Sequence, residues 1–537
     1  MRVRFLLVVM MAVACVSVAA AQPEHHHDFD PHEKLGTVHF PVSCGAATAK
    51  PFERGVALLH SFWYEQARKQ FQQIEASDPK CAMAYWGDAM TYWHQLWNEP
   101  DEATLEQGSA LIEKAKAAHA ATERERDYIA ALAEFYTGYQ HRDHAARAAA
   151  YSTAMEKLYA KYPKDDEAGA FYALSLLASA PRRDATFANQ KKAIALLDTL
   201  YARNPGHPGI PHYIIHSCDT PQLAPLGLNA ARAYAKEALS SPHALHMPAH
   251  IFARLGLWQE DIQSNLASVA AAEKDHATMH EVHAMDFLNY AYLQIGQDDK
   301  AQAMNTKLSG IPKMLDMPEM APFLEEIRAE FPATYAIETR DWKGAKTLKV
   351  PDGVGDYAAV VTFWARGIGA GHLCDVQAAE AALKDYNDAV NRLSKTKLAW
   401  MVPSMDTDRD EISAWLAFAE GKNDDAEKML RAVADRQDSL GKGEVALPAR
   451  EMLADMLLEM NRPEQALAEY EQSMKIDPNR FNGLYGAARS AELLKQPEKA
   501  RGYYAQLLKN CEGSNSYRPE LAKAKEQLAV GTAVGGK

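Results

Sequence analysis

The sequence lacks the motifs that mark the common enzyme classes. Only six of its 537 residues are cysteine, and no two are spaced C-x-x-C, so thiol redox chemistry has no support. The G-x-S-x-G nucleophile elbow, the G-x-x-x-x-G-K-S/T phosphate loop, the G-x-G-x-x-G dinucleotide fingerprint and the H-E-x-x-H zinc-protease helix are missing as well. Motifs therefore assign no catalytic residue.

Long apolar runs and strand patterns are also scarce. No stretch after the N-terminus approaches the roughly 18 consecutive apolar residues of a membrane span, and no series of alternating β-branched residues predicts a sheet. At the N-terminus, Arg2 and Arg4 precede an apolar run over residues 5–18 and then three alanines at 19–21. This pattern predicts a secretory signal peptide over residues 1–21 and an exported protein, periplasmic or extracellular, without a transmembrane segment.

Lipid attachment is the alternative to simple cleavage. Ala12-Val13-Ala14-Cys15 loosely resembles a lipobox, in which Cys15 would become the lipidated first residue. The first position of that motif is poor and a small-residue cleavage site follows it, so the signal peptide is favoured.

Charge argues against nucleic acid as a partner. The chain has 71 acidic and 58 basic residues, a net charge of −13. Such a surface repels a phosphate backbone.

Five cysteines remain after the predicted cleavage, and an odd number leaves at least one thiol unpaired. Cys44 and Cys81 are the favoured disulfide, because both lie near the first expected helical hairpin. The alternative is that all five cysteines are small buried residues without a disulfide.

Internal repeats give the strongest signal for the fold. Near the C-terminus five residues recur after 34 positions: Ala454, Pro463, Glu464, Ala466 and Tyr470 as Ala488, Pro497, Glu498, Ala500 and Tyr504. Near the N-terminus the same step relates His60, Trp63 and Glu65 to His94, Trp97 and Glu99. The turns at Gly256 and Gly296 are 40 residues apart, so the array is irregular.

These units resemble the tetratricopeptide repeat. The residues that carry the resemblance are Gly55, Ala67, Phe71 and Pro79 in the first unit and Ala454, Ala466, Tyr470 and Pro478 near the end. The resemblance implies an all-α fold, a right-handed superhelical solenoid of antiparallel helix pairs.

We expect five segments along the chain. They are the signal peptide (1–21), an extended histidine-rich N-terminal segment (22–49), an N-terminal helical array (50–347), a C-terminal helical array (348–528) and a disordered tail (529–537). Pro351, Gly353 and Gly355 predict the bend between the two arrays.

Nine of the 20 histidines fall between His207 and His283. The pairs His212/His216 and His246/His250 are spaced i,i+4, which places both imidazoles of a pair on one helix face. His212, His246 and His280 follow the 34-residue step, whereas matching Gly256 to Gly296 places His243 on His283 and His246 on Asp286. The two registers are expected to exclude each other. Either one puts the histidines on first helices, which by the resemblance line the concave groove.

The segment therefore predicts a site for zinc or copper. The candidate ligands are His212, His216, His243, His246, His250, His280, His283 and Asp286, and Met247, Asp219 and Glu281 are expected beside them in the groove. The alternative is that these histidines bond neighbouring helices or a polar ligand without a metal. Pro248 is expected to kink its helix and disturb the facing of His246 and His250.

Two smaller groups have weaker signals. His25, His26, His27 and His32 form a cluster that predicts a solvated tail or a weak metal scavenger. A second group is aromatic and is expected to pack between hairpins in preference to stacking on a ligand: Trp63, Tyr85, Trp86, Tyr92, Trp93 and Trp97. His60 and His94 beside them are interpreted as packing residues.

The segment from His212 to Trp258 resembles that of exported bacterial tetratricopeptide proteins without an assigned activity. The resemblance implies a scaffold that binds a peptide or protein partner in its concave groove. The alternative hypothesis is a metal-binding protein or metal-dependent enzyme, using zinc or copper, centred on the His207–His283 segment.

Overall fold

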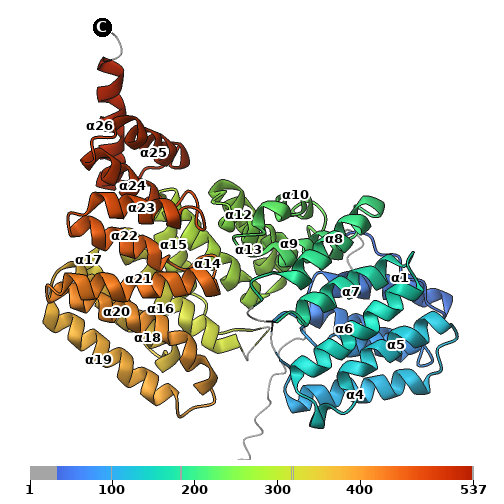
Figure 1. Cartoon of the computed structure of the whole chain (residues 1–537). Coiled ribbons are helices and arrows are strands. Elements are labelled where there is room, and N and C mark those ends of the chain that lie inside the picture. Colours follow the sequence, from blue (N-terminus) through green and yellow to red (C-terminus); the bar gives the residue numbers. More distant parts are fainter. Residues whose placement is uncertain (1–32, 98, 182–183, 316, 318–319, 535–537) are drawn as a thin grey trace, which may run out of the picture. The chain divides into compact units, whose positions relative to one another are not determined.

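The computed structural model describes residues 33–97, 99–181, 184–315, 317 and 320–534. The predicted signal peptide, Cys15 and the histidines at 25–32 lie outside the described residues. Among these residues the secondary structure is helical, and no β-strand is present (Figure 1). In chain order the α-helices are α1 (Ala49–His60), α2 (Tyr64–Ser77), α3 (Ala82–Met90), α4 (Glu102–Ala117), α5 (Glu123–Tyr136), α6 (His144–Lys161), α7 (Asp166–Ala178), α8 (Ala188–Arg203), α9 (Gly209–Cys218), α10 (Ala224–Tyr234), α11 (Pro242–His246), α12 (Pro248–Arg254), α13 (Trp258–Asp275), α14 (Thr278–Gln294), α15 (Asp298–Ser309), α16 (Ala321–Glu338), α17 (Trp342–Lys346), α18 (Asp356–His372), α19 (Val376–Leu393), α20 (Asp406–Ala419), α21 (Asn423–Leu440), α22 (Ala449–Glu459), α23 (Pro463–Ser473), α24 (Phe481–Leu493), α25 (Pro497–Asn510) and α26 (Pro519–Val534).

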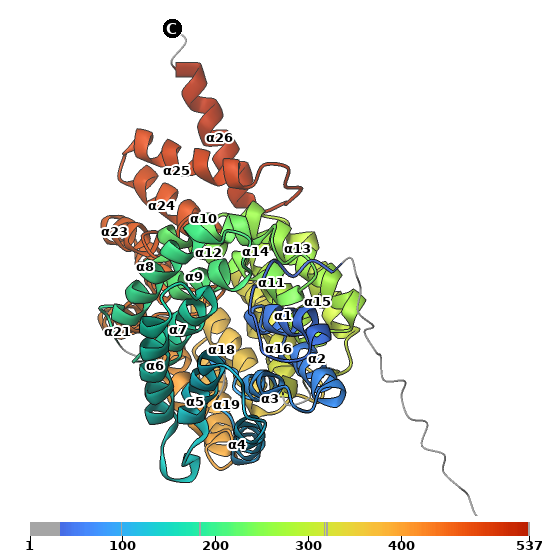
Figure 2. The same ribbon diagram turned by 90° about the vertical axis from the view of Figure 1, so that its right-hand side faces the viewer.

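Successive helices pack as antiparallel pairs, and each pair packs on the next (Figures 1 and 2). The first pair is α1 with α2 and the last is α24 with α25, while α11 and α12 together form one arm opposite α13. The predicted fold class, an all-α solenoid of paired helices, is confirmed. No helix among the described residues is both long and apolar enough to cross a bilayer.

Glycines let aromatic rings of an adjacent helix approach closely, which explains the repeat signature. A Cβ on Gly55 or Gly87 would lie 2.7 or 2.4 Å from the ring of Phe71, and a Cβ on Gly486 would lie 2.1 Å from the ring of Tyr470. No side chain fits in those gaps. The small and aromatic positions of the sequence repeat are therefore the two sides of one helix contact.

We expect Gly486→Ala to destabilise the protein by about 1–3 kcal/mol, because the added methyl group must displace the Tyr470 ring inside a packed core. Gly502 in α25 is the matched control, since nothing lies within 4 Å of its Cβ position. Gly502→Ala should stabilise by about 0.5–1 kcal/mol through helix propensity alone. Urea unfolding followed by circular dichroism measures both changes; destabilisation by both variants would contradict this account of the repeat.

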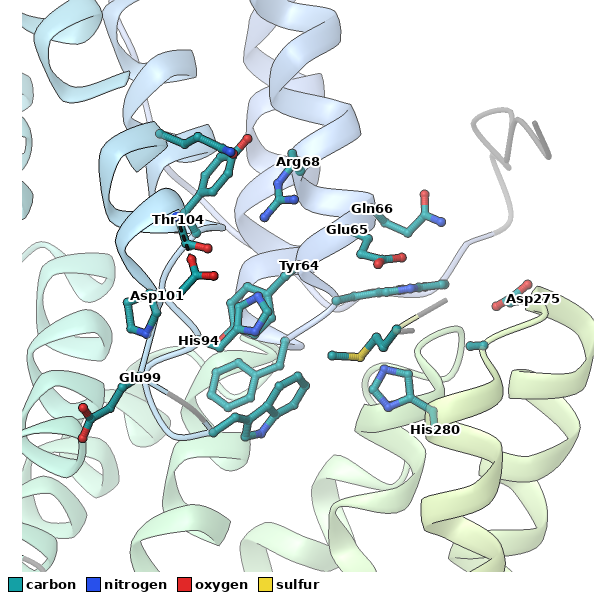
Figure 3. Close-up of a pocket in the computed structure, with 18 residues that line it drawn as sticks. Tyr64, Glu65, Gln66, Arg68, His94, Glu99, Asp101, Thr104, Asp275 and His280 are labelled. Carbon is teal, nitrogen blue, oxygen red and sulfur yellow. Dashed lines mark hydrogen bonds between the residues drawn. The ribbon is translucent and has the colours of Figure 1, made fainter. Parts of the chain in front are cut away.

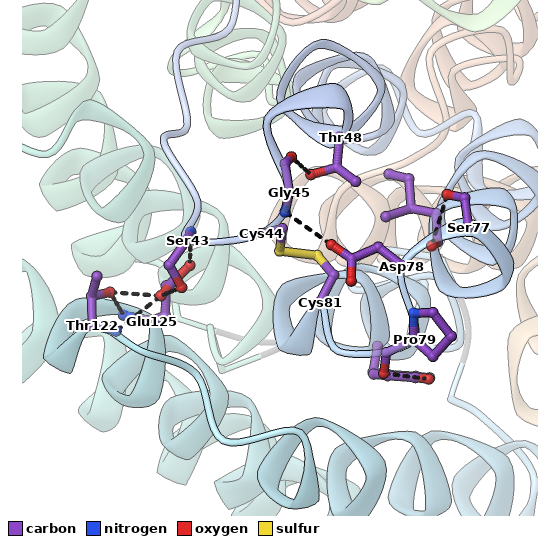
Figure 4. Close-up of a disulfide and its surroundings, with 12 residues drawn as sticks. Ser43, Cys44, Gly45, Thr48, Ser77, Asp78, Pro79, Cys81, Thr122 and Glu125 are labelled. Atoms are coloured by element: carbon purple, nitrogen blue, oxygen red, sulfur yellow. Dashed lines mark hydrogen bonds between the residues drawn. A yellow bond between two sulfur atoms is a disulfide. The ribbon is translucent and has the colours of Figure 1, made fainter.

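The N-terminal segment is extended over its described part and packs along the array. Leu35, Val38 and Phe40 are buried, and the Phe40 ring lies 4.9 Å from that of Tyr128. The Cys44–Cys81 disulfide fastens the end of this segment to the start of α3 (Figure 4), as predicted. Cys218, Cys374 and Cys511 are free thiols.

The Ser43 backbone N–H and hydroxyl reinforce that attachment. Both donate to the Glu125 carboxylate at 2.5 Å (Figure 4). Glu125 in turn closes the capping box of α5 with Thr122, so the segment is tied to a helix terminus as well as to a disulfide.

The loop at Pro351–Gly355 joins α17 to α18, and residues from Lys34 onward form one compact unit. One expectation about the C-terminal end needs correction. The segment from Ala529 is helical to Val534 within α26, although disorder was expected from 529. The helix begins at Pro519 among strong helix formers such as Glu520, Ala522 and Lys523, and it continues through the single glycine at 531, which costs about 1 kcal/mol relative to alanine.

The C-terminal repeats contact the turns of the middle repeats, far away in sequence. Trp258 Nε1 donates to the Asn479 carbonyl at 2.9 Å, and the Arg518 guanidinium bonds Asp298 at 2.5 Å. The loop between α21 and α22 also reaches α12, where Arg254 donates to the Lys442 carbonyl at 2.9 Å. His212, His243, His246 and His280 are buried, and the same loop also brings Glu444 to His250, so the face that carries the histidines is an interior and not an open groove.

Candidate histidine metal centre

The structure gathers six of the predicted ligands into two sets of three. The first histidine cluster comprises His212, His216 and His243, from α9 and α11; the second histidine cluster comprises His246, His250 and His283, from α11, α12 and α14. Within each cluster, one ring nitrogen from every histidine lies within 4.8 Å of the other two.

Each sequence register holds in part, which corrects the expectation that one excludes the other. The i,i+4 pair of the first cluster recurs 34 residues later in the second, whereas the third histidine, His243, recurs 40 residues later as His283. The extra residues fall between His250 and His283, where α13 has 18 residues against 11 in α10. His280, the third histidine at the 34-residue step, and Asp286, the counterpart of His246 at the 40-residue step, belong to neither cluster.

The first histidine cluster presents buried nitrogens that lack a partner. The His212 Nδ1–H donates to the His60 carbonyl at 2.5 Å, and because a carbonyl only accepts, His212 Nε2 carries a bare lone pair. Nε2 of His212, of His216 and of His243 is buried without a hydrogen-bond partner among the described residues. Burial lowers the pKa of His212 to about 3 and those of His216 and His243 well below the ordinary value. The three rings are therefore neutral at pH 7.

The second histidine cluster is oriented by hydrogen bonds from outside it. Asn265 donates its amide to Asp261, so its Oδ1 accepts from His246 Nδ1 at 2.6 Å and leaves His246 Nε2 unprotonated. His250 Nδ1 lies 3.0 Å from the Asp219 carboxylate and 2.9 Å from that of Glu444. Carboxylate and amide partners behind imidazoles are the arrangement that orients metal-binding histidines.

His250 has the opposite protonation state to its neighbours. Burial opposes its charged form, yet the carboxylates of Asp219 and Glu444 raise the pKa of His250 to about 10. Its Nε2–H then donates to His246 Nε2, 3.0 Å away. One proton thus lies between His246 Nε2 and His250 Nε2. The third histidine of the cluster is neutral, because burial lowers the pKa of His283 to about 3.

A phenylalanine covers each cluster. The Phe62 ring stacks on His216 and His243, with centroids 5.3 and 5.7 Å apart, and the Phe287 ring lies 4.7 Å from His246 and 5.0 Å from His250. Phe62 is held at φ 54°, in the left-handed region, which costs about 1 kcal/mol or more for such a residue. No sequence signal marked either phenylalanine.

The remaining two predicted ligands, His280 and Asp286, are members of neither cluster. His280 on α14 is beside His243, with ring centroids 5.5 Å apart. Asp286 belongs to neither cluster, and burial with the charges of Glu326 and Glu444 raises its pKa to about 8, which makes it a poor ligand at pH 7.

The three expected groove residues do not form one surface. Met247 is fully buried, Asp219 is the carboxylate behind His250, and Glu281 pairs with Lys307 at 3.1 Å. Pro248 separates α11 from α12 as expected, yet His246 and His250 still face each other.

A third buried group, His60, Glu167 and His207, is structural. Glu167 bridges His60 Nε2 at 2.7 Å and His207 Nε2 at 2.9 Å. The other ring nitrogens bond the Tyr213 hydroxyl and the Gly209 N–H. Every nitrogen has a partner, so this group differs from the first histidine cluster; its role is to fix the His60 carbonyl that orients His212. The interpretation of His60 as a hydrogen-bonded packing residue agrees with this geometry.

The predicted aromatic group divides between core and cavity. Trp86 and Trp93 are buried, whereas Trp63, Tyr92 and Trp97 line a cavity next to His280 (Figure 3). Trp97 also packs edge-on against Phe62 and Tyr64, with ring centroids 5.6 and 5.5 Å apart.

No protein-family model matches the sequence, and no curated protein sequence matches it. Solved structures of helical-repeat proteins are similar at low identity. A human IFIT1 dimer with PPP-AAAA is 12% identical, covering 85% of this chain and 88% of that chain with a TM-score of 0.34. The P58(IPK) TPR domain is 16% identical over 68% and 99% of the two chains, with a TM-score of 0.21. Naa15/Naa10 bound to HypK-THB is 13% identical over 92% and 98%, with a TM-score of 0.26. These similarities support no conclusion about what this chain binds.

Proposed function

We propose that this protein binds zinc or copper ions at two sites inside its helical-repeat scaffold, one in each histidine cluster. The observation that carries the proposal is the set of three buried Nε2 atoms, on His212, His216 and His243, without a hydrogen-bond partner among the described residues. An unsatisfied buried polar atom costs about 1–3 kcal/mol. A metal ion coordinated by the three nitrogens would remove that cost.

The ligand chemistry selects the metal class. Neutral imidazoles suit zinc, copper and neighbouring divalent ions, and for such a site copper(II) binds more tightly than zinc or cobalt. Three protein ligands leave a coordination position open, as in catalytic zinc sites. Metal-dependent catalysis is therefore compatible with the arrangement, and Phe62 and Phe287 would keep the metals away from bulk water.

We also propose that the protein is exported to the periplasm or beyond. The signal-peptide pattern supports this location, and the Cys44–Cys81 disulfide fits an oxidising compartment.

A protein or peptide partner is the second candidate, because helix-pair repeats commonly recruit partners. It would bind elsewhere than on the histidine face, since His212, His246 and Met247 are buried. The net charge of −13 speaks against nucleic acid.

Metal titration tests the proposal. In the mature protein, His25, His26, His27 and His32 are replaced by serine so that they cannot bind metal. Equilibrium dialysis and elemental analysis should then find about two copper or zinc ions per chain. His216→Ala and His283→Ala should each remove one ion, from the first and second cluster respectively.

His141→Ala is the matched control, because this histidine is exposed at the end of a short 3-10 helix. It should leave the stoichiometry unchanged. A protein that binds no metal, or that binds it equally after both cluster substitutions, would refute the proposal.

A further inference from the structure

A cavity of about 490 Å³ lies between the start of α2, the segment before α4 and the start of α14 (Figure 3). This is the size of a small-molecule site. It is next to the first histidine cluster, because Phe62 and His280 belong to its wall and Phe62 also stacks on His216 and His243.

Aromatic rings form much of the wall in a fixed arrangement. Tyr64 stacks with His94, with centroids 4.2 Å apart and an interplanar angle of 18°, and with Phe62 at 5.4 Å and 20°. Trp97 meets Tyr64 edge-on at 5.5 Å and 87°. Trp63 lines the cavity and is partly exposed. Rings that hold one another in place lose little conformational entropy when a ligand binds.

The charged groups on the wall are mainly acidic. Among the described residues that line the cavity, four are carboxylates and one is a guanidinium: Glu65, Glu99, Asp101, Asp275 and Arg68 (Figure 3). Arg68 donates to Thr91 through Nε and Nη2, each at 3.0 Å, and Asp101 accepts from the Thr104 N–H at 2.8 Å as the cap of α4. An anionic ligand would therefore meet three more negative than positive groups.

The cavity wall already contains one contact between a cation and an aromatic ring. The Arg68 guanidinium lies over the Tyr92 ring, 4.0 Å from its centroid. That contact is a cation–π interaction inside the protein. A metal ion is not the favoured ligand, because none of the four carboxylates belongs to a group of possible metal ligands among the described residues.

We infer that this cavity is a binding site for a small organic cation of the alkylammonium class. A tryptophan face together with carboxylates is the recognition chemistry of quaternary ammonium groups, and Trp63 is the ring that supplies this face, since His94 and Phe62 stack on Tyr64 and Arg68 lies over Tyr92. The site is distinct from the two metal sites and does not depend on them. A ligand in the cavity would lie against Phe62 and His280, one ring away from the first histidine cluster.

Binding of choline to the metal-free mature protein tests the inference, with EDTA present so that the result is independent of metal. Isothermal titration calorimetry should show choline binding at least about tenfold more tightly than 3,3-dimethylbutan-1-ol, in which carbon replaces the ammonium nitrogen. Trp63→Leu should weaken choline binding about tenfold, and Glu65→Gln and Asp275→Asn should each weaken it several-fold.

Trp400→Leu is the control for the loss of a tryptophan, since Trp400 is 73% exposed and does not line the cavity. It should bind choline like the parent protein. Circular dichroism confirms that each variant is folded. Equal affinity for choline and its neutral isostere, tighter binding of benzoate than of choline, or no binding of choline at all would overturn the inference.

Discussion

Replacement of Arg480 by methionine is expected to lower the free energy of unfolding by about 3–5 kcal/mol. Arg480 is 1% exposed. Its guanidinium bonds Glu338 on α16 at 2.6 Å, Glu451 on α22 at 2.9 Å and the Tyr290 hydroxyl on α14. Methionine fills a similar apolar volume but leaves two carboxylates without their cation in the interior.

Urea unfolding followed by circular dichroism measures this effect, and the transition that includes the C-terminal repeats should move to lower urea. Arg392→Met is the matched control. Arg392 pairs with Asp356 at 2.6 Å, but its side chain is 57% exposed. An exposed pair contributes about 1 kcal/mol or less, so equal destabilisation by the two variants would contradict the role assigned to Arg480.

The second large effect is a difference in pH dependence between the two metal sites. A metal that enters the second histidine cluster must displace the proton of His250, whose pKa is about 10. Below that pKa each unit of falling pH should weaken binding about tenfold, or about 10³-fold from pH 8 to pH 5. In the first histidine cluster burial has already removed the protons, with the pKa of His212 about 3. Its affinity should be nearly constant over the same range.

The single-cluster variants allow each site to be measured separately. His216→Ala reports the second cluster and His283→Ala the first, in competition titrations with a chelator of known affinity at each pH. Glu444→Gln removes one of the two carboxylates that hold the His250 proton, so it should flatten the pH dependence of the second cluster only. Parallel pH profiles for the two parent sites would show that the protonation states are assigned wrongly.

The sequence is sufficient for the features that depend on local spacing. The 34-residue recurrence of small and aromatic residues predicts paired helices, because such residues let adjacent helices pack closely, as Gly486 on α24 does with the Tyr470 ring on α23. The i,i+4 histidine pairs are placed on one helix face each, and Cys44 with Cys81 is a pair of neighbours across the first hairpin.

The sequence is insufficient where contacts come from distant segments. Glu444 reaches His250 from 194 residues away, and Asn265 orients His246 from the partner helix; neither stands in a motif. The third histidine of each cluster depends on the irregular length of the intervening repeat, which a fixed step cannot give. The loop that carries Lys442 and Glu444 packs on α12 from the C-terminal half of the chain, so an open groove was expected where the protein has an interior.

Anomalous X-ray diffraction from crystals of the copper- or zinc-loaded protein is the most direct test of the two metal sites. We expect two anomalous peaks, one bound at about 2.0–2.1 Å by ring nitrogens of His212, His216 and His243, and one by those of His246, His250 and His283. Peaks only at other surfaces, or a fully loaded crystal in which these six imidazoles contact no metal, would contradict the account.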